Sequence, residues 1–279
     1  MPECNAAGRE TMNDRGSGTR QLEICVDSVE SAVAAERGGA QRVELCSDLL
    51  EGGVTPSHGL IAQVRRHIAI DLFVILRPRG GDFCYSGLEL EQMEDDIAHV
   101  RDLGVNGITL GVLDEQARVD VEQTRRLVQK AEPLPVTFHR AIDMTADPCA
   151  ALGFVIESGA QRVLTSGGAA KAIHALPVIC QMQSLAGDRI RVMAGGGITA
   201  QNVACIAGAT GATEFHASLR AHWHSPVLYR RPDILLGEIG DREYLRYGVR
   251  EEAVRALAAE LQRLDEQHAS APAGRVIRR

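Results

Sequence analysis

The stretch Leu22-Glu23-Ile24-Cys25-Val26 and its counterpart Arg42-Val43-Glu44-Leu45-Cys46 decide how the chain is interpreted. Each is a short β-branched and apolar run that carries Glu-x-Cys, and residues two apart in a strand point to the same side. Glu23 and Cys25 therefore share one face of a predicted strand, and Glu44 and Cys46 share one face of the next. Carboxylates beside thiols suit an apolar core poorly, so the pattern predicts a polar interior with a function. The opposite, apolar face carries Leu22, Ile24, Val26, Val43 and Leu45.

Length and composition fit one large globular domain. The chain has 279 residues, 45% of them hydrophobic, and a formal net charge of −7. The acidic balance argues against nucleic-acid binding, which needs a basic face. No apolar run approaches the roughly 18 residues of a membrane span, and the N-terminus lacks the apolar segment of a secretory signal. Seven irregularly spaced cysteines do not make a disulfide framework, so we expect reduced thiols in a cytoplasmic protein.

Alternating strand and helix patterns predict the fold. Strands alternating with helices indicate βαβ units and a parallel sheet, and eight units in about 245 residues fit a closed TIM (β/α)8 barrel. The alternative is an open doubly wound sheet, but the first strand is not followed by a dinucleotide-binding Gly-x-Gly-x-x-Gly. The strands are expected at 22–26, 42–46, 72–76, 107–110, 135–138, 162–165, 190–193 and 213–216.

The ends of the chain and one internal repeat complete the predicted organisation. We expect a single barrel over residues 21–265, a disordered N-terminal tail over 1–20 and a loose C-terminal tail over 266–279. Glu251 to Leu264 is the expected closing helix, preceded by an irregular segment from Asp233 to Tyr247. The sequence Gly-Ala-Gln-Arg-Val occurs at 39–43 and again at 159–163, four units apart, which suggests a duplicated half-barrel.

Closure of such a barrel would bring the eighth strand beside the first. The eighth strand carries Glu214 and His216, which would join Glu23 with Cys25 and Glu44 with Cys46 on three adjacent strands. Two thiolates and an imidazole suit Cu(I) or Zn(II), so Cys25, Cys46 and His216 are the candidate metal ligands. The alternative is that the cysteines pack as small apolar residues and the glutamates pair with arginines.

A second set of residues favours binding of a small anion at the carboxyl ends of the strands, where TIM barrels place their active sites. Arginine offers forked donors for phosphate or carboxylate, and glycine loops can present backbone N–H groups. The candidate anion-binding residues are Arg77, Arg140, Ser166, Gly195 and Gly196. The glycines could instead serve only tight turns, with the arginines neutralising interior glutamates.

Acid–base chemistry has its own candidates at the same end of the barrel: Glu23, Glu44, His139 and Glu214. With these residues, an alternative function is that of a TIM-barrel enzyme. It would act on a small phosphorylated or carboxylated metabolite and have no physiological role in copper handling. A non-catalytic interaction protein is a third class, and it predicts a large apolar outer patch.

Long motifs in the chain resemble the CutC family of copper homeostasis proteins. The resemblance runs from about residue 22 to 230 and implies a cytoplasmic, oligomeric barrel that binds Cu(I) through Cys25 and Cys46. The expected homo-oligomer could use the aromatic residues Trp223, Tyr229, Tyr244 and Tyr247, since such residues favour interface cores. The motifs are Glu23-Ile24-Cys25-Val26-Asp27-Ser28, Glu44-Leu45-Cys46, Glu51-Gly52-Gly53-Val54-Thr55-Pro56-Ser57, Arg77-Pro78-Arg79-Gly80-Gly81-Asp82-Phe83, Phe138-His139-Arg140-Ala141, Val163-Leu164-Thr165-Ser166-Gly167 and Gly195-Gly196-Gly197-Ile198.

Overall fold

Eight parallel strands form a closed barrel in the computed structural model, which describes residues 19–236 and 242–270. The strands follow one another around the barrel in chain order, and the eighth pairs with the first. The predicted (β/α)8 barrel is therefore confirmed. The strands are β1 (Gln21–Val26), β2 (Arg42–Leu45), β3 (Asp71–Ile75), β4 (Gly107–Leu110), β5 (Val136–Phe138), β6 (Arg162–Thr165), β7 (Arg191–Gly195) and β8 (Glu214–Ala217).

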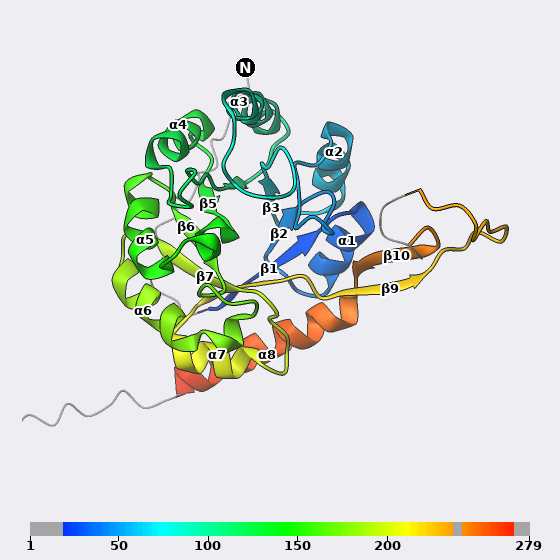
Figure 1. Cartoon of the computed structure of the whole chain (residues 1–279). Helices are drawn as coiled ribbons and strands as arrows, with labels where there is room; N and C mark the ends of the chain where they lie inside the picture. Colours follow the sequence, from blue (N-terminus) through cyan, green and yellow to red (C-terminus); the bar gives the residue numbers. More distant parts are fainter. Residues whose placement is uncertain (1–18, 237–241, 271–279) are drawn as a thin grey trace, which may run out of the picture.

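Helices form a ring outside the strands, as Figure 1 shows. A helix follows each of the first seven strands, and α8 follows the eighth after a β-hairpin. Two 3-10 helices, Arg140–Met144 and Ala172–His174, lie in the connections after β5 and β6. The helices are α1 (Val29–Arg37), α2 (His58–His67), α3 (Gly87–Arg101), α4 (Val121–Ala131), α5 (Pro148–Glu157), α6 (Leu176–Ala186), α7 (Val203–Thr210) and α8 (Glu251–Ser270).

Side chains at the helix N-termini fix where several helices begin. The Ser86 hydroxyl accepts a hydrogen bond from the Glu89 N–H, and the Glu89 carboxylate accepts one from the Ser86 N–H, which is a capping box. The Asp120 carboxylate caps α4 by accepting from the Gln123 N–H at 3.0 Å. These caps satisfy N–H groups that have no partner inside the helix.

The repeated Gly-Ala-Gln-Arg-Val sequence makes the same joint in both halves of the barrel. Gly39 and Gly159 have φ values of +96° and +90°, which glycine adopts at low cost. Gln41 Oε1 accepts from the Leu22 N–H at 2.8 Å, while Gln161 Oε1 accepts from the Val136 N–H at 2.6 Å. Each glutamine thus completes the hydrogen bonding at the start of the preceding strand.

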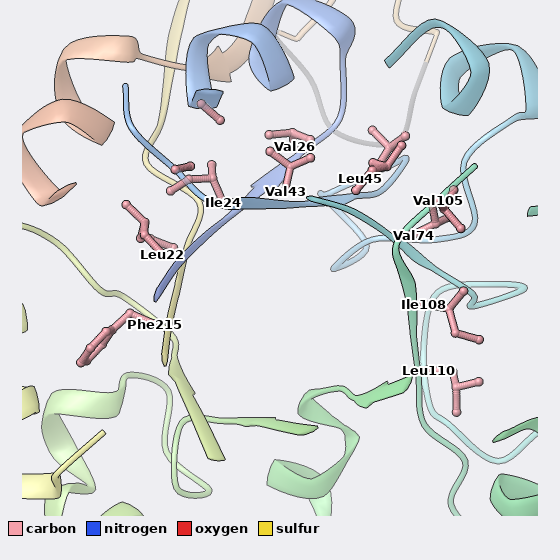
Figure 2. Close-up of a cluster of buried hydrophobic side chains, with 14 of the residues drawn as sticks. Leu22, Ile24, Val26, Val43, Leu45, Val74, Val105, Ile108, Leu110 and Phe215 are labelled. Atoms are coloured by element: carbon pink, nitrogen blue, oxygen red, sulfur yellow. The ribbon is translucent and has the colours of Figure 1, made fainter. Parts of the chain in front are cut away.

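The strand register sets which side chains face the interior. Glu23 lies opposite His216 on β8, and Cys25 lies opposite Glu44 on β2. The alternate side chains of β1 and β2 point outward and pack under the helices, as predicted. Figure 2 shows this apolar layer, which is buried: Leu22, Ile24, Val26, Val43, Leu45, Val74, Val105, Ile108, Leu110 and Phe215.

An antiparallel hairpin replaces part of the irregular segment expected between Asp233 and Tyr247. Strand β9 (Arg220–His224) pairs with β10 (Leu245–Val249), and Figure 1 shows the hairpin extending away from the barrel. An added Cβ at Gly248 would lie 2.7 Å from the Trp223 ring, so glycine makes room for that ring. Each strand alternates over only five residues, and the connection over residues 225–244 is too long for a short hairpin turn, so the pairing was not recognisable in the sequence.

The two ends of the described chain meet at α8. This helix continues past Leu264 to Ser270, because helix-forming residues follow Leu264 and the Ser270 hydroxyl donates to the Glu266 carbonyl at 2.7 Å. The first part of the predicted C-terminal tail is therefore helical. Arg20 forms an ion pair with Asp265 at 2.5 Å. The rest of both predicted tails, residues 1–18 and 271–279, lies outside the described residues.

Candidate functional site

A cavity of about 540 Å³ opens at the carboxyl ends of the barrel strands. Residues of β1, β2, β3, β6 and β8 line it, together with residues of the loops after β2, β3, β5, β6, β7 and β8, so residues far apart in the sequence share one cavity. Its walls carry both charged and apolar groups, which is typical of small-molecule sites. Among the lining residues are Cys25, Glu44, Glu51, Arg77, Phe83, His139, Arg140, Asp143, Lys171, Gly196, Gly197, His216 and Ser218.

Cys25 and Cys46 lie together at the floor of this cavity. Their Sγ atoms are 3.5 Å apart, and the Cys46 sulfur is 3.7 Å from Glu44 Oε2. Cys25 lines the cavity and is 6% exposed, whereas Cys46 is fully buried behind it. Ligand atoms of Cys25, Glu44 and Cys46 all lie within 4.8 Å of one another, so a metal ion could contact all three.

His216 joins this group across the seam between β8 and β1. Its Nδ1 is 2.7 Å from Glu23 Oε1, its Nε2 is 3.8 Å from Glu44 Oε2, and the ring is hydrogen-bonded to Cys25. Burial would lower the pKa of His216, but the hydrogen bonds to Cys25 and Glu23 and the nearby Glu44 carboxyl raise it well above its usual value. His216 is therefore an imidazolium at neutral pH.

The pKa values of Cys25, Cys46 and Glu44, which lie near His216, are shifted in different directions from their usual values. The hydrogen bond with Cys46 lowers the pKa of Cys25 to about 6, against the effect of burial. That same bond and burial raise the pKa of the Cys46 thiol well above its usual value. Burial raises the pKa of Glu44 to about 8, despite the nearby His216 charge. At neutral pH the site thus pairs a thiolate at Cys25 with a protonated Glu44.

A layer of ion pairs closes the barrel beneath the cavity. Arg42 pairs with Glu23 and lies 2.9 Å from Glu214 Oε2, and Arg162 Nε lies 2.5 Å from the same oxygen. Burial opposes ionisation of these carboxyls, but nearby positive groups outweigh it. Arg162 and Arg42 bring the pKa of Glu214 down to about 2, and Arg42 and His216 hold the pKa of Glu23 well below its usual range. Neither Glu23 nor Glu214 lines the cavity. Glu214 thus serves the ion-pair layer, and Glu23 reaches the cavity only through His216.

His139 lines the opposite wall as a neutral ring. The Ala141 N–H donates to its Nδ1 at 3.3 Å, which leaves the ring hydrogen on Nε2. Burial and the charge of Arg77 lower the pKa of His139 to about 3. Among the described residues, Nε2 is buried and finds no hydrogen-bond partner.

Most of the predicted anion-binding donors already have partners within the chain. Arg77 lines the cavity, and its terminal nitrogens donate to the carbonyls of Glu51, Gly53 and Gly81 at 2.6–2.9 Å. Arg140 Nε pairs with Asp143 at 2.8 Å. The Ser166 N–H also donates to Asp143, at 2.9 Å.

Asp143 binds the loop after β6, where Ser166 was predicted to contribute to a small-anion site. It accepts hydrogen bonds from the backbone N–H groups of Ser166 and Gly168 and from the Thr165 hydroxyl. This carboxylate was missed in the sequence, although it stands three residues after Arg140. Lys171, which lines the cavity, was missed as well because it lies in no motif. Of the β7 loop, Gly196 lines the cavity and Gly195 lies at the end of the strand.

Comparison with known proteins identifies the family. Residues 20–221 match the CutC family. A CutC family protein of Chromobacterium violaceum is 46% identical over 236 residues, which are 85% of this chain and 96% of the relative. The mouse protein named copper homeostasis protein cutC homolog is 50% identical over 216 residues, covering 77% of this chain and 79% of the relative.

Solved structures agree with this assignment. The putative copper homeostasis protein CutC from Streptococcus agalactiae superimposes with a TM-score of 0.68 at 32% identity, over 71% of this chain and 98% of that one. A phosphoribosylanthranilate isomerase from Thermotoga maritima, at 12% identity and a TM-score of 0.53, covers 87% of this chain and 98% of its own and shares the fold alone. None of the helices in residues 19–236 and 242–270 has the length and apolarity needed to span a bilayer. The fold, the paired Glu-x-Cys strands and these relatives show that the chain belongs to the CutC family.

Proposed function

We propose that this chain is a copper homeostasis protein that binds Cu(I) through Cys25 and Cys46. The observation that carries the proposal is the 3.5 Å separation of the two sulfur atoms on adjacent strands. Thiolates are the ligands that Cu(I) prefers in proteins. Family membership and the name of the mouse relative, copper homeostasis protein cutC homolog, also support it.

The donor set fits a site made of two thiolates. Cu(I) with two thiolates carries a net charge of −1, and the His216 imidazolium beside Cys25 can offset that charge. Both nitrogens of His216 face carboxyl groups, Glu23 at 2.7 Å and Glu44 at 3.8 Å. In this proposal His216, the predicted third ligand, therefore acts as a counter-charge, and it would ligate the ion only after losing a proton.

Delivery of the ion would use the cavity. Cys25 is the thiol that lines it, and Cys46 lies buried behind Cys25. An incoming Cu(I) would meet Cys25 first and then displace the Cys46 proton. Because both residues must stay reduced for this, the proposal places the protein in the cytoplasm.

A competitive Cu(I) titration under reducing conditions tests the proposal. The wild type should bind one tight equivalent, and Cys25→Ser and Cys46→Ser should each lose it. A variant without Cys180 and Cys205, the cysteines that are exposed among residues 19–236 and 242–270, should keep the tight equivalent; its changes are Cys180→Ser and Cys205→Ser. If the Cys25→Ser/Cys46→Ser double variant binds copper as the wild type does, the proposal is wrong.

A further inference from the structure

The cavity holds polar groups for which copper binding has no use. Lys171 and His139 line it on the side formed by the loops after β5, β6 and β7, and Cys25 faces it from β1. Its volume of about 540 Å³ greatly exceeds that of a single metal ion and falls in the range of small-molecule sites.

Lys171 supplies a positive charge to this wall. Among residues 19–236 and 242–270 it has no ion-pair partner, although it is exposed at the cavity. Its stem crosses the β7 loop, where an added Cβ at Gly197 would lie 3.0 Å from Lys171 Cγ. An anionic group in the cavity would therefore find an ammonium that no carboxylate neutralises. The sequence has one other lysine, Lys130, at the end of α4.

His139 supplies an unused hydrogen-bond donor. The Ala141 N–H occupies Nδ1, so Nε2 carries the hydrogen, and that nitrogen is buried with no partner among the described residues. A buried N–H group without a partner is costly. A ligand oxygen that reached this donor would relieve that cost.

Cys25 stands in the arrangement of an activated nucleophile. Its thiol is hydrogen-bonded to His216, whose Nδ1 is held by Glu23 Oε1 at 2.7 Å. A cysteine sulfur, a histidine beside it and a carboxylate that orients the histidine are the groups found around cysteine nucleophiles. Of this set, Cys25 and His216 line the cavity, whereas Glu23 does not.

We propose that the cavity binds a small carbonyl compound bearing a carboxylate or a phosphate, and that Cys25 adds to its carbonyl carbon. Lys171 binds the anionic group, and the His139 Nε2–H donates to the carbonyl oxygen. The Cys25 sulfur forms a bond to the carbon, while the C=O π electrons move to the oxygen. The His216 imidazolium gives its proton to that oxygen, so the products are a thiohemiacetal and a neutral His216, and no other reactant is needed. Copper on Cys25 would block this step, so the two ligands compete.

Alkylation of Cys25 in the metal-free protein tests this inference. Iodoacetate and iodoacetamide both transfer a carbon to sulfur with loss of iodide, but only iodoacetate carries a carboxylate. We expect the ratio of iodoacetate to iodoacetamide rates to be about fivefold higher at Cys25 than at the exposed Cys180 and Cys205, from one favourable charge contact. Peptide mapping by mass spectrometry gives each rate separately.

Matched variants test whether Lys171 causes the higher ratio of alkylation rates at Cys25. Lys171→Gln should reduce the Cys25 ratio to that of Cys180, and Lys130→Gln should leave it unchanged. Added acetate and inorganic phosphate should compete with iodoacetate, and the stronger competitor identifies the anionic group. An unreactive Cys25 or a ratio equal to that of Cys180 would overturn the inference, and so would a Lys171→Gln variant that keeps the wild-type ratio. None of these outcomes depends on the copper titration.

Discussion

His216 Nδ1 lies 2.7 Å from Glu23 Oε1 across the seam where β8 meets β1, so barrel closure also fixes the group beside Cys25. Glu23 in turn holds Arg42 in the ion-pair layer. One buried carboxylate thus serves both the stability of the barrel and the orientation of the site.

Replacing Glu23 by Gln should weaken both roles. The variant leaves the Arg42 charge without one of its partners, so we expect the free energy of unfolding to fall by about 3 kcal/mol, as for other broken buried ion pairs. Urea denaturation measures this loss, and NMR titration should show a lower pKa for His216. As a control, Glu260→Gln removes a surface partner of Arg263 and should change neither quantity. Unchanged stability and an unchanged His216 pKa in Glu23→Gln would contradict the assignment.

Copper affinity should fall as the pH is lowered, in two stages. Above pH 6 the Cys25 thiol is ionised and the Cys46 thiol is protonated, so Cu(I) binding releases about one proton. Affinity should then drop about tenfold for each pH unit. Below pH 6 both thiols hold protons and the slope should double. Competition titrations from pH 5 to 8 measure how the Cu(I) affinity changes with pH. An affinity independent of pH would rule out two protonatable thiol ligands.

Glu44→Gln should remove a pH-dependent loss of stability. The pKa of Glu44 rises from 4.5 to about 8 on burial, so the folded state binds more protons than the unfolded state between these values. Its contribution to stability therefore falls as the pH rises through that window. We expect the unfolding free energy of the variant relative to the wild type to increase by on the order of 3 kcal/mol from pH 5 to 8. A difference that stays constant over this range would show that Glu44 titrates normally.

Exposed apolar residues between β9 and β10, among them Leu228, Tyr229 and Leu236, should hold copies of the chain together. Leu228 and Leu236 are 98% and 87% exposed, and Tyr229 is 75% exposed, which is costly for a surface that stays in water. Light scattering at micromolar concentration should therefore report a homo-oligomer, and Leu228→Ser with Leu236→Ser should shift the mass toward the monomer. The matched change Leu88→Ser, at an exposed leucine of α3, should leave the mass unchanged. A monomeric wild type would refute the expected assembly.

The sequence predicted the barrel because the alternation of residues along its strands and the helical period of its helices are both clear. Residues alternate in and out along each strand, so the placement of Glu23, Cys25, Glu44 and Cys46 on one face required only the parity of their positions. Closure then brought His216 beside Glu23 as expected.

The partners of individual side chains could not be predicted in the same way. The glycine-rich loop after β6 looks like a phosphate cradle, but Asp143 fills it, and this depends on the shape of the 3-10 helix Arg140–Met144. Lys171 and the β9–β10 hairpin belong to no recognisable pattern. Their positions in the fold are set by three-dimensional packing, which a single sequence does not reveal.

The buried members of the ion-pair layer balance their charge separately within each half of the barrel, and Arg191, which also pairs with Glu214, is 41% exposed to solvent. The first half contributes Glu23 and Arg42, and the second contributes Glu214 and Arg162. The repeated Gly-Ala-Gln-Arg-Val joint places the two arginines at equivalent positions of β2 and β6. A four-strand half could therefore meet a second copy of itself without burying an unpaired charge, which removes the main electrostatic barrier to making such a barrel by gene fusion.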